Sequence, residues 1–339
     1  MSRLKEVAEL AGVSEATESR ALRDISHVKR ETRSAVRAAA KELGYGPYAI
    51  DPDFDSVPAK VNAIGVIAPF LNRWYFSHAI AGAEQTLRSA GLNLLLYNFD
   101  QVRGREKLFK AELKQSRVVA LLIVSVPPTE EEFQAVLNLD IPLSLIGVTH
   151  EGQSSVSIDD VAGGKTATQH LINQGHRKIG LITGPRNNPF NFAVSNNRRN
   201  GYLEALAENG IAFNPDHEVI GDFTLATGLH AMNTLLARKD RPTAVFCESD
   251  EMAIGAIHSI RKHGLRVPED ISVVGFDDYE MSEYADLTTI RQAVGQLGEL
   301  AAYQILEKLK KPNTVSRQIT LPTKLIVRGS TRKLETEID

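Results

Sequence analysis

The sequence predicts a small all-α segment at the N-terminus, followed by a larger α/β region made of two doubly wound parallel-sheet subdomains. The first 50 residues show three short helical patterns and no strand pattern. After residue 61, continuous apolar runs alternate with amphipathic stretches of helix length, which is typical of parallel sheets covered on both faces. The number of these alternating strand and helix units is larger than one sheet of about six strands needs, so we expect two subdomains with a cleft between them.

The N-terminal segment has the pattern of a helix-turn-helix. Apolar residues recur at helical spacing over residues 4–11, Gly12 follows where a tight turn needs a permissive backbone, and Ser14 can cap a second helix. In such a motif the second helix enters the major groove of DNA. The side chains expected to face bases or phosphates are those of Ser14, Glu15, Ala16, Thr17, Ser19 and Arg20. A third helix is expected over residues 31–43.

The apolar runs of the α/β region are expected to be strands. They are AIGVIAP from Ala63, LNLLLYN from Leu92, VVALLIVSV from Val118, IPLSLIG from Ile141, KIGLITG from Lys178, TAVFC from Thr243 and ISVVGFD from Ile271. Helices are expected between them, among them one that begins at Phe76 and a charged one over residues 105–115. Open α/β sheets bind ligands at the carboxyl ends of their strands, so the cleft is a predicted small-molecule site.

The composition excludes several classes of protein. Cys247 is the only cysteine among 339 residues, which rules out an internal disulfide and a four-cysteine zinc module. No run of about eighteen apolar residues occurs, so neither a signal peptide nor a membrane span is expected, and we predict a cytoplasmic protein. The net charge is −3, while residues 1–50 hold nine Lys/Arg against seven Asp/Glu, a surplus that favours DNA binding only weakly.

Motifs of catalysis and metal binding are missing from the sequence. The GGKT stretch at Gly163 lacks the glycine-rich turn of a nucleotide-binding loop, and the spacing of His170 and His176 suits no zinc motif. No GxSxG, HExxH or GxGxxG pattern occurs, and Cys247 lies within an apolar run. We therefore expect no enzymatic activity, no metal and no cofactor.

The first fifty residues resemble the headpiece of the LacI/GalR family of transcription regulators. The matching residues are Val7, Ala8, Ala11, Gly12, Val13, Ser14, Thr17, Ser19, Arg20 and Leu22, followed by ETRSAVRAAAKELGYGP. The resemblance implies double-stranded operator DNA as a partner, bound by a homodimer. Glu18 departs from the apolar residue that is usual in the family, and Arg23 replaces a frequent Asn and adds a candidate phosphate contact. The alternative is a helical hairpin inside another soluble domain.

The segment DPDFDSVPAKV from Asp51 stands where the family has a hinge helix with an apolar wedge for the minor groove. Pro52 and Pro58 restrict helix formation, and three aspartates add negative charge that phosphates would repel. Phe54 lies near the wedge position and is a candidate DNA contact. Two readings stay open here, a modified hinge and a solvated linker.

The remainder of the chain resembles the family's periplasmic-binding-protein-like core. The matching motifs are HLINQGHRKIGLITG at His170, RRNGYLEAL at Arg198, SDEMAIGAIHSI at Ser249, VPEDISVVGFDD at Val267 and LTTIRQAVGQLGELAA at Leu287. The resemblance implies three parts, which are a headpiece over 1–50, a linker over 51–61 and a core over 62–333. Within the core it places one subdomain at about 62–160 and 292–320 and the other at about 161–291 and 321–333.

Two charged residues are the first candidates for binding an effector. Arg198 begins a predicted helix with a five-donor fork that suits ligand oxygens, and Asp277 follows an apolar strand at its carboxyl end, where a carboxylate can accept two hydroxyl donors. Both match effector-binding positions of the family, as does Phe223, the family's ring-stacking aromatic. The alternative for the two charges is a structural ion pair across the cleft.

Further candidates follow the first and the sixth apolar runs. Trp74, Tyr75 and Phe76 stand at the predicted cleft mouth, and we expect one or two of these rings to face a ligand. Ser249 and Asp250 are the next predicted polar contacts, although Asp250 could equally cap the helix that follows it.

Together these features predict a ligand-responsive DNA-binding regulator, expected to be a repressor. Its core would bind a small sugar, sugar derivative or nucleoside and change operator affinity allosterically. The alternative is a cytoplasmic small-molecule binding module with impaired or lost DNA binding, which Glu18 and the acidic linker favour.

Overall fold

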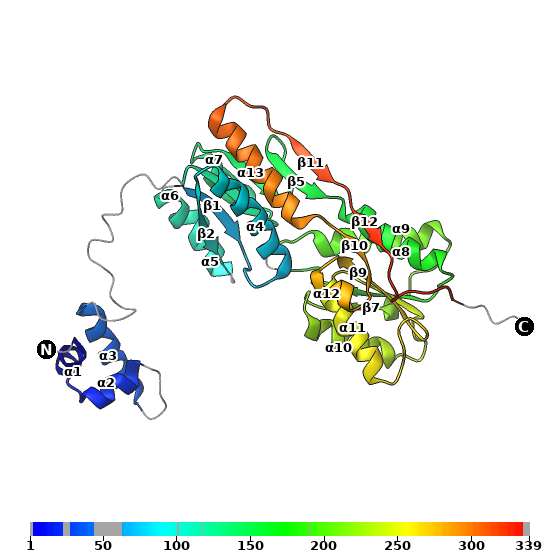
Figure 1. Cartoon of the computed structure of the whole chain (residues 1–339), viewed down its shortest axis with the longest axis horizontal. Helices are drawn as coiled ribbons and strands as arrows, with labels where there is room; N and C mark the ends of the chain where they lie inside the picture. The colour runs from blue at the N-terminus through cyan, green and yellow to red at the C-terminus, as the bar shows by residue number, and fades with distance from the viewer. Residues whose placement is uncertain are drawn as a thin grey trace, which may run out of the picture. The chain divides into compact units, whose positions relative to one another are not determined.

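The protein is described by a computed structural model that covers residues 3–22, 28–43, 63–99, 102–116, 118–188 and 190–334. The chain divides into two compact units, Met1–Val61 and Asn62–Asp339 (Figure 1). The N-terminal unit is all-α and the larger unit contains two six-stranded sheets, so the predicted fold class is confirmed. Arg23, Phe54 and the linker over 51–61 lie outside the described residues.

The described residues of the N-terminal unit form a headpiece of three helices, α1 Arg3–Leu10, α2 Glu15–Leu22 and α3 Arg30–Glu42. Gly12 adopts a positive φ of 65° in the turn between α1 and α2, a conformation that glycine reaches without a steric penalty. Ser14 Oγ accepts a hydrogen bond from the Thr17 amide at 3.3 Å and so caps α2. The buried residues of the small core are Val7, Ala21, Val36, Ala39 and Ala40.

The first sheet of the larger unit is entirely parallel, in the order β11-β5-β4-β3-β1-β2. Its strands are β1 Ala63–Ala68, β2 Asn93–Asn98, β3 Ala120–Val124, β4 Leu143–Ile146, β5 Ser154–Ile158 and β11 Gln318–Leu321. Every residue of β1 and β3 is buried, which explains the continuous apolar runs there. Helices α4 Trp74–Ser89 and α13 Val294–Lys310 share a hydrophobic core with one face. A second hydrophobic core of this sheet contains side chains from α7 Glu130–Leu137 and from the helical stretch Leu108–Gln115.

The second sheet has the order β12-β10-β9-β8-β6-β7 and is parallel except for the β10–β12 pair. Its strands are β6 Ile179–Thr183, β7 Glu218–Ile220, β8 Ala244–Cys247, β9 Ser272–Asp277, β10 Thr288–Arg291 and β12 Lys324–Ile326. One hydrophobic core joins it to α8 Asp160–Asn173 and α9 Val194–Glu208. Another joins it to α10 Leu225–Leu236 and α11 Asp250–Lys262. Short helices α5 Val102–Lys107 and α12 Glu280–Tyr284 complete the larger unit (Figure 1).

The chain passes between the two sheets three times, from β5 to α8, from β10 to α13 and from β11 to β12. We call the first sheet with its helices the first subdomain and the second sheet with its helices the second subdomain. Since all three connections are short, they restrict relative motion of the subdomains to a hinge.

Helices α10 and α11 approach closely because glycines lie at their contact. A Cβ atom on Gly255 would lie 2.1 Å from the Leu225 carbonyl oxygen, which no side chain tolerates without backbone movement. We expect Gly255→Val to lower the free energy of unfolding by about 2–3 kcal/mol, measured by chemical denaturation. Gly295→Ala is the matched control, since a Cβ there meets no atom within 4 Å, and its stability should stay unchanged or rise slightly. Equal stability of both variants would contradict the close helix contact.

Candidate ligand-binding site

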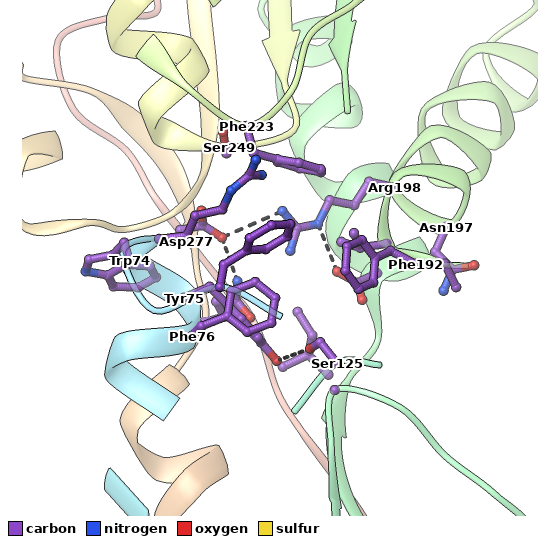
Figure 2. A pocket seen from close by; sticks show the side chains of 18 of the residues that line it. Trp74, Tyr75, Phe76, Ser125, Phe192, Asn197, Arg198, Phe223, Ser249 and Asp277 are labelled. Atoms are coloured by element: carbon purple, nitrogen blue, oxygen red, sulfur yellow. Dashed lines mark hydrogen bonds and ion pairs between the residues drawn. The ribbon is translucent and has the colours of Figure 1, made fainter. Parts of the chain in front are cut away.

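A cavity of about 130 Å³ lies between the two subdomains, at the carboxyl ends of several strands (Figure 2). The predicted residues that line it are Trp74, Tyr75, Phe76, Arg198, Phe223, Ser249 and Asp277. Other lining residues that the sequence did not single out include Phe70, Arg73, Ser125, Asp160, Phe192, Asn197, Glu251 and Gln292. The cavity therefore brings together seven predicted residues from distant parts of the chain.

Arg198 is held in a fixed orientation on α9. Its Nε donates to Asp160 Oδ1 at 2.8 Å and its Nη1 donates to the Glu248 carbonyl oxygen at 2.5 Å. The guanidinium lies 3.6 Å from the centroid of the Phe276 ring, and Nη1 is 3.6 Å from Asp277 Oδ1. In Figure 2 the guanidinium lies among the labelled aromatic side chains. Such a preorganised donor binds a ligand oxygen with little further loss of side-chain entropy.

Asp277 ends β9 with a positive φ of 125°, a strained conformation that turns its carboxylate toward the cavity. Gln292 Nε2 donates to Asp277 Oδ1 at 2.6 Å, while the buried Gln292 Oε1 has no hydrogen-bond partner in the part of the chain that the structure describes. Burial raises the pKa of Asp277, and the Arg198 charge opposes that rise. Arg198 and Asp277 both belong to the second subdomain, so the alternative prediction of an ion pair across the cleft is wrong for these two residues.

Aromatic side chains form the apolar walls of the cavity. Phe223 has a positive φ of 53°, and its ring lies so close to Gly184 that a Cβ atom there would be 2.1 Å from it. Tyr75 accepts a hydrogen bond from Ser125 Oγ at 3.1 Å, and burial raises its pKa to about 12, so the phenol is uncharged. Phe76 is 8% exposed and also belongs to the core of the first subdomain. A planar or apolar ligand face can stack on such walls.

The cavity mouth is bridged by polar contacts between the subdomains. Arg73, which precedes α4, pairs with Asp222 Oδ2 of the second subdomain at 3.2 Å. Trp74 Nε1 donates to Glu280 Oε2 at 2.8 Å, and His78 Nε2 lies 2.8 Å from Glu280 Oε1. Trp74 therefore stands at the mouth, whereas Tyr75 lies deeper in the cavity (Figure 2).

Ser249 and Asp250 have structural contacts at the start of α11. Ser249 Oγ accepts a hydrogen bond from the Met252 amide at 3.3 Å, so Ser249, and not Asp250, caps this helix. Asp250 does not line the cavity. Its carboxylate accepts hydrogen bonds from the Tyr279 amide at 2.9 Å, Ser282 Oγ at 2.6 Å and Thr289 Oγ1 at 2.5 Å. These bonds tie α11 to the loop after β9, to α12 and to β10.

Glu248 is a fully buried carboxyl group behind the Arg198 cluster. Its Oε2 accepts a hydrogen bond from the Gly184 amide at 2.8 Å, and its Oε1 has no hydrogen-bond partner among the described residues. Burial raises the pKa of Glu248 from 4.5 to about 8. The folded protein binds the carboxyl proton of Glu248 more tightly than the unfolded chain does. The protonated group therefore contributes fully to the free energy of unfolding below about pH 4.5, and this contribution is lost as the pH rises through about 8.

Glu248→Gln is therefore expected to flatten the pH dependence of stability between pH 5 and pH 9. The variant should exceed the parent at pH 9 by an amount on the order of a few kcal/mol, because Gln cannot ionise. The measurement is thermal unfolding across this range, with the exposed Glu299→Gln as control. Parallel curves for parent and Glu248→Gln would show that Glu248 stays ionised in the folded protein.

The headpiece presents the start of α2 to solvent. Ser14, Glu15 and Ala16 are exposed and Thr17 is half-buried, which is compatible with the predicted contact to DNA. The side chains of Glu18, Ser19 and Arg20 lie outside the described part of the structure, as do Arg23 and Phe54. No helix of the described residues is long and apolar enough to cross a membrane. No cluster of three potential metal ligands occurs among them either.

Comparison with known proteins identifies both units. Residues 3–48 match the model of bacterial regulatory proteins of the lacI family, and residues 168–331 match a periplasmic binding protein-like domain. The ribose operon repressor of Haemophilus influenzae is 34% identical over 341 residues, which cover 99% of this chain and 100% of the relative. Its description as a repressor confirms the expectation of a regulator rather than an enzyme.

Two solved structures are similar over nearly the whole chain. The transcriptional regulator CelR in complex with cellobiose is 31% identical with a TM-score of 0.72, covering 96% of this chain and 99% of CelR. The lac repressor dimer bound to operator and the anti-inducer ONPF is 30% identical with a TM-score of 0.70, covering 96% and 98%. With its helix-turn-helix headpiece and its periplasmic-binding-protein-like core, the chain belongs to the LacI family of transcriptional regulators.

Proposed function

We propose that this chain is a homodimeric repressor whose core binds a small sugar-like or nucleoside-like effector and thereby changes its affinity for operator DNA. The observation that carries the proposal is a cavity with a fixed Arg198, the carboxylates of Asp160 and Asp277, and aromatic walls, in one chain with a helix-turn-helix. The ribose operon repressor, the CelR–cellobiose complex and the operator-bound lac repressor dimer support it.

The chemistry of the cavity favours a ligand rich in hydroxyl groups. A hydroxyl donates and accepts, so it can pair both with the Arg198 guanidinium and with the acceptors Asp277 and Gln292 Oε1. The rings of Phe223 and Tyr75 offer faces on which a pyranose, a furanose or a nucleobase can stack. A carboxylate, which only accepts hydrogen bonds, would leave Gln292 Oε1 unpaired and would bring a further negative charge beside the buried carboxyl groups of Asp160 and Asp277.

Ligand binding would act by closing the cleft around the three connections between the subdomains. The two subdomains would rotate against each other, and in a symmetric dimer this rotation changes the separation of the headpieces and hence the fit to two half-sites. A coupling free energy of about 1–3 kcal/mol is typical of such systems.

Fluorescence anisotropy tests this function directly. The purified chain is titrated against its own upstream promoter duplex and a scrambled duplex at two salt concentrations, with and without ribose, cellobiose and cytidine. We expect a promoter preference that persists at the higher salt and an affinity that changes with one of these ligands.

The second candidate is a small-molecule binding module without specific DNA binding. Glu18 in the recognition helix and three aspartates in the linker favour it, because both place negative charge near phosphates. Binding that is weak, blind to sequence and lost at higher salt, in a folded protein that still binds a ligand, would establish this alternative.

A further inference from the structure

The segment between β6 and α9 connects two elements of the second subdomain, yet its aromatic side chains lie in the first. Phe190 is 5% exposed and belongs to the hydrophobic cluster of Phe99, Phe109 and Phe133 in the first subdomain. Its ring centroid lies 5.9 Å from that of Phe70 and 5.5 Å from that of Phe99. The segment therefore crosses the cleft and adds a non-covalent attachment to the three chain connections.

The backbone of the segment is fastened as well. Arg105 Nη1 donates to the Phe190 carbonyl oxygen at 3.2 Å. Arg105 is only 4% exposed, and its other nitrogens donate to Glu132 at 2.8 and 2.6 Å and to the Pro127 carbonyl oxygen at 2.8 Å. A buried arginine with all these partners is rigid, so the point at which it holds the segment is fixed to the first subdomain.

The same segment supplies Phe192, which lines the cavity. Asn188 Oδ1 accepts from the amides of Phe190 and Phe192 at 3.0 and 2.9 Å, and Asn188 Nδ2 donates to the Phe192 carbonyl oxygen at 3.2 Å. The two phenylalanine rings lie 5.5 Å apart. Because Asn188 joins their backbones, displacement of Phe190 must also displace Phe192 from the cavity wall.

We propose that Phe190 and Arg105 are positioning residues of the effector site, which dock this segment as a strap across the cleft and hold Phe192 against the ligand. The proposal rests on the proposed function for the identity of the ligand, but the strap itself is a property of the free protein. Opening of the cleft requires Phe190 to leave its aromatic pocket. The strap thus favours the closed arrangement and limits how far the subdomains separate.

Two readouts follow cleft opening without DNA or effector. Trp74 is the only tryptophan and contacts Tyr279 and Glu280 across the cleft, so its emission moves to longer wavelength when the mouth opens. Cys247 is fully buried, so cysteines introduced by Lys114→Cys and Lys262→Cys, one in each subdomain, accept spin labels selectively. Pulsed electron spin measurements then give the distance distribution across the cleft.

Phe190→Ala is compared with Phe133→Ala, which removes an equally buried ring of the same cluster from a helix that lies wholly within the first subdomain. We expect Phe190→Ala to shift Trp74 emission to longer wavelength and to lengthen the distance, whereas Phe133→Ala lowers only the melting temperature. Phe190→Leu, the milder variant that keeps an apolar side chain, should lie between the parent and Phe190→Ala. It also serves as the test if Phe190→Ala does not fold.

Unchanged distances and emission in both Phe190 variants, or equal shifts in Phe133→Ala, would overturn the strap. Neither result bears on operator binding, so failure of the strap and failure of the regulatory function are distinguished by separate measurements.

Discussion

Arg198→Met is expected to abolish effector binding and to lower the melting temperature by roughly 10 °C. Arg198 is 4% exposed and is the cation that faces both Asp160 and Asp277, which lie 2.8 and 3.6 Å from it. Removing one partner of a buried ion pair leaves an uncompensated charge and typically costs about 3–5 kcal/mol. The methionine also loses the contact with the Phe276 ring.

The loss of stability should depend on pH in a defined direction. Burial already raises the pKa of Asp160 and Asp277, and removal of the guanidinium raises both further. The variant should therefore recover stability as the pH falls, because the two carboxyl groups take up protons. Thermal unfolding at several pH values measures this, and isothermal calorimetry with the ligand found in the promoter assay measures binding.

Arg199→Met provides the matched control for Arg198→Met. Arg199 is the next residue on α9, and its partner Glu218 lies outside the cavity. This variant should keep effector binding close to that of the parent. If Arg199→Met lost ligand binding to the same extent, or Arg198→Met retained it, the assignment of Arg198 to the site would be wrong.

Val36→Asp is expected to reduce operator affinity to the non-specific level, roughly 1000-fold or more below specific binding. Val36 is fully buried, together with Val7, Ala21, Ala39 and Ala40, in the hydrophobic core that the described residues of the headpiece form. A buried unpaired carboxylate costs several kcal/mol, which is comparable with the whole stability of a domain this small. The larger unit has its own cores, so ligand binding should persist.

Anisotropy with the promoter duplex and calorimetry with the ligand measure the two effects of Val36→Asp separately. Ala38→Asp places the same charge on an exposed position of the same helix and serves as the control. It should retain most of the specific affinity. Full operator binding by Val36→Asp would contradict the role of the headpiece core.

The strands that the sequence predicted correctly are those with continuous apolar runs, such as β1, β3 and β9. The apolar pattern does not reveal β5, β7 or β10–β12, because they are short and polar at many positions, like SSVSI in β5 and QITL in β11. β7, β11 and β12 have no buried residue, and β5 and β10 are buried only because neighbouring elements of the assembled fold cover them.

Two residues that line the cavity, Asp160 and Gln292, are not predicted because they follow strands that the apolar pattern does not show. Asp160 and Gln292 each come within two residues of the end of a strand, β5 and β10, which is the position where open α/β sheets bind ligands. Unless those two strands are recognised, nothing in the sequence indicates that Asp160 and Gln292 lie at the ligand site. Phe192 lies in a connecting segment, and no periodic pattern predicts that such a segment crosses the cleft.

For Asp250 the sequence does not distinguish a ligand contact from a structural role. Its position after β8 and beside Ser249 is equally suited to a ligand contact and to a structural role. The hydrogen bonds from Tyr279, Ser282 and Thr289 come from residues about 30 to 40 positions away, so only the tertiary structure reveals that its carboxylate is already satisfied.

Ligand closure in the core and operator binding by the headpiece are expected to be energetically coupled. The most direct test is calorimetric titration of the ligand into the free protein and into its operator complex. We expect the two ligand affinities to differ by about 5- to 150-fold, and by the same factor by which the ligand changes operator affinity. Identical ligand affinities with and without operator would contradict it.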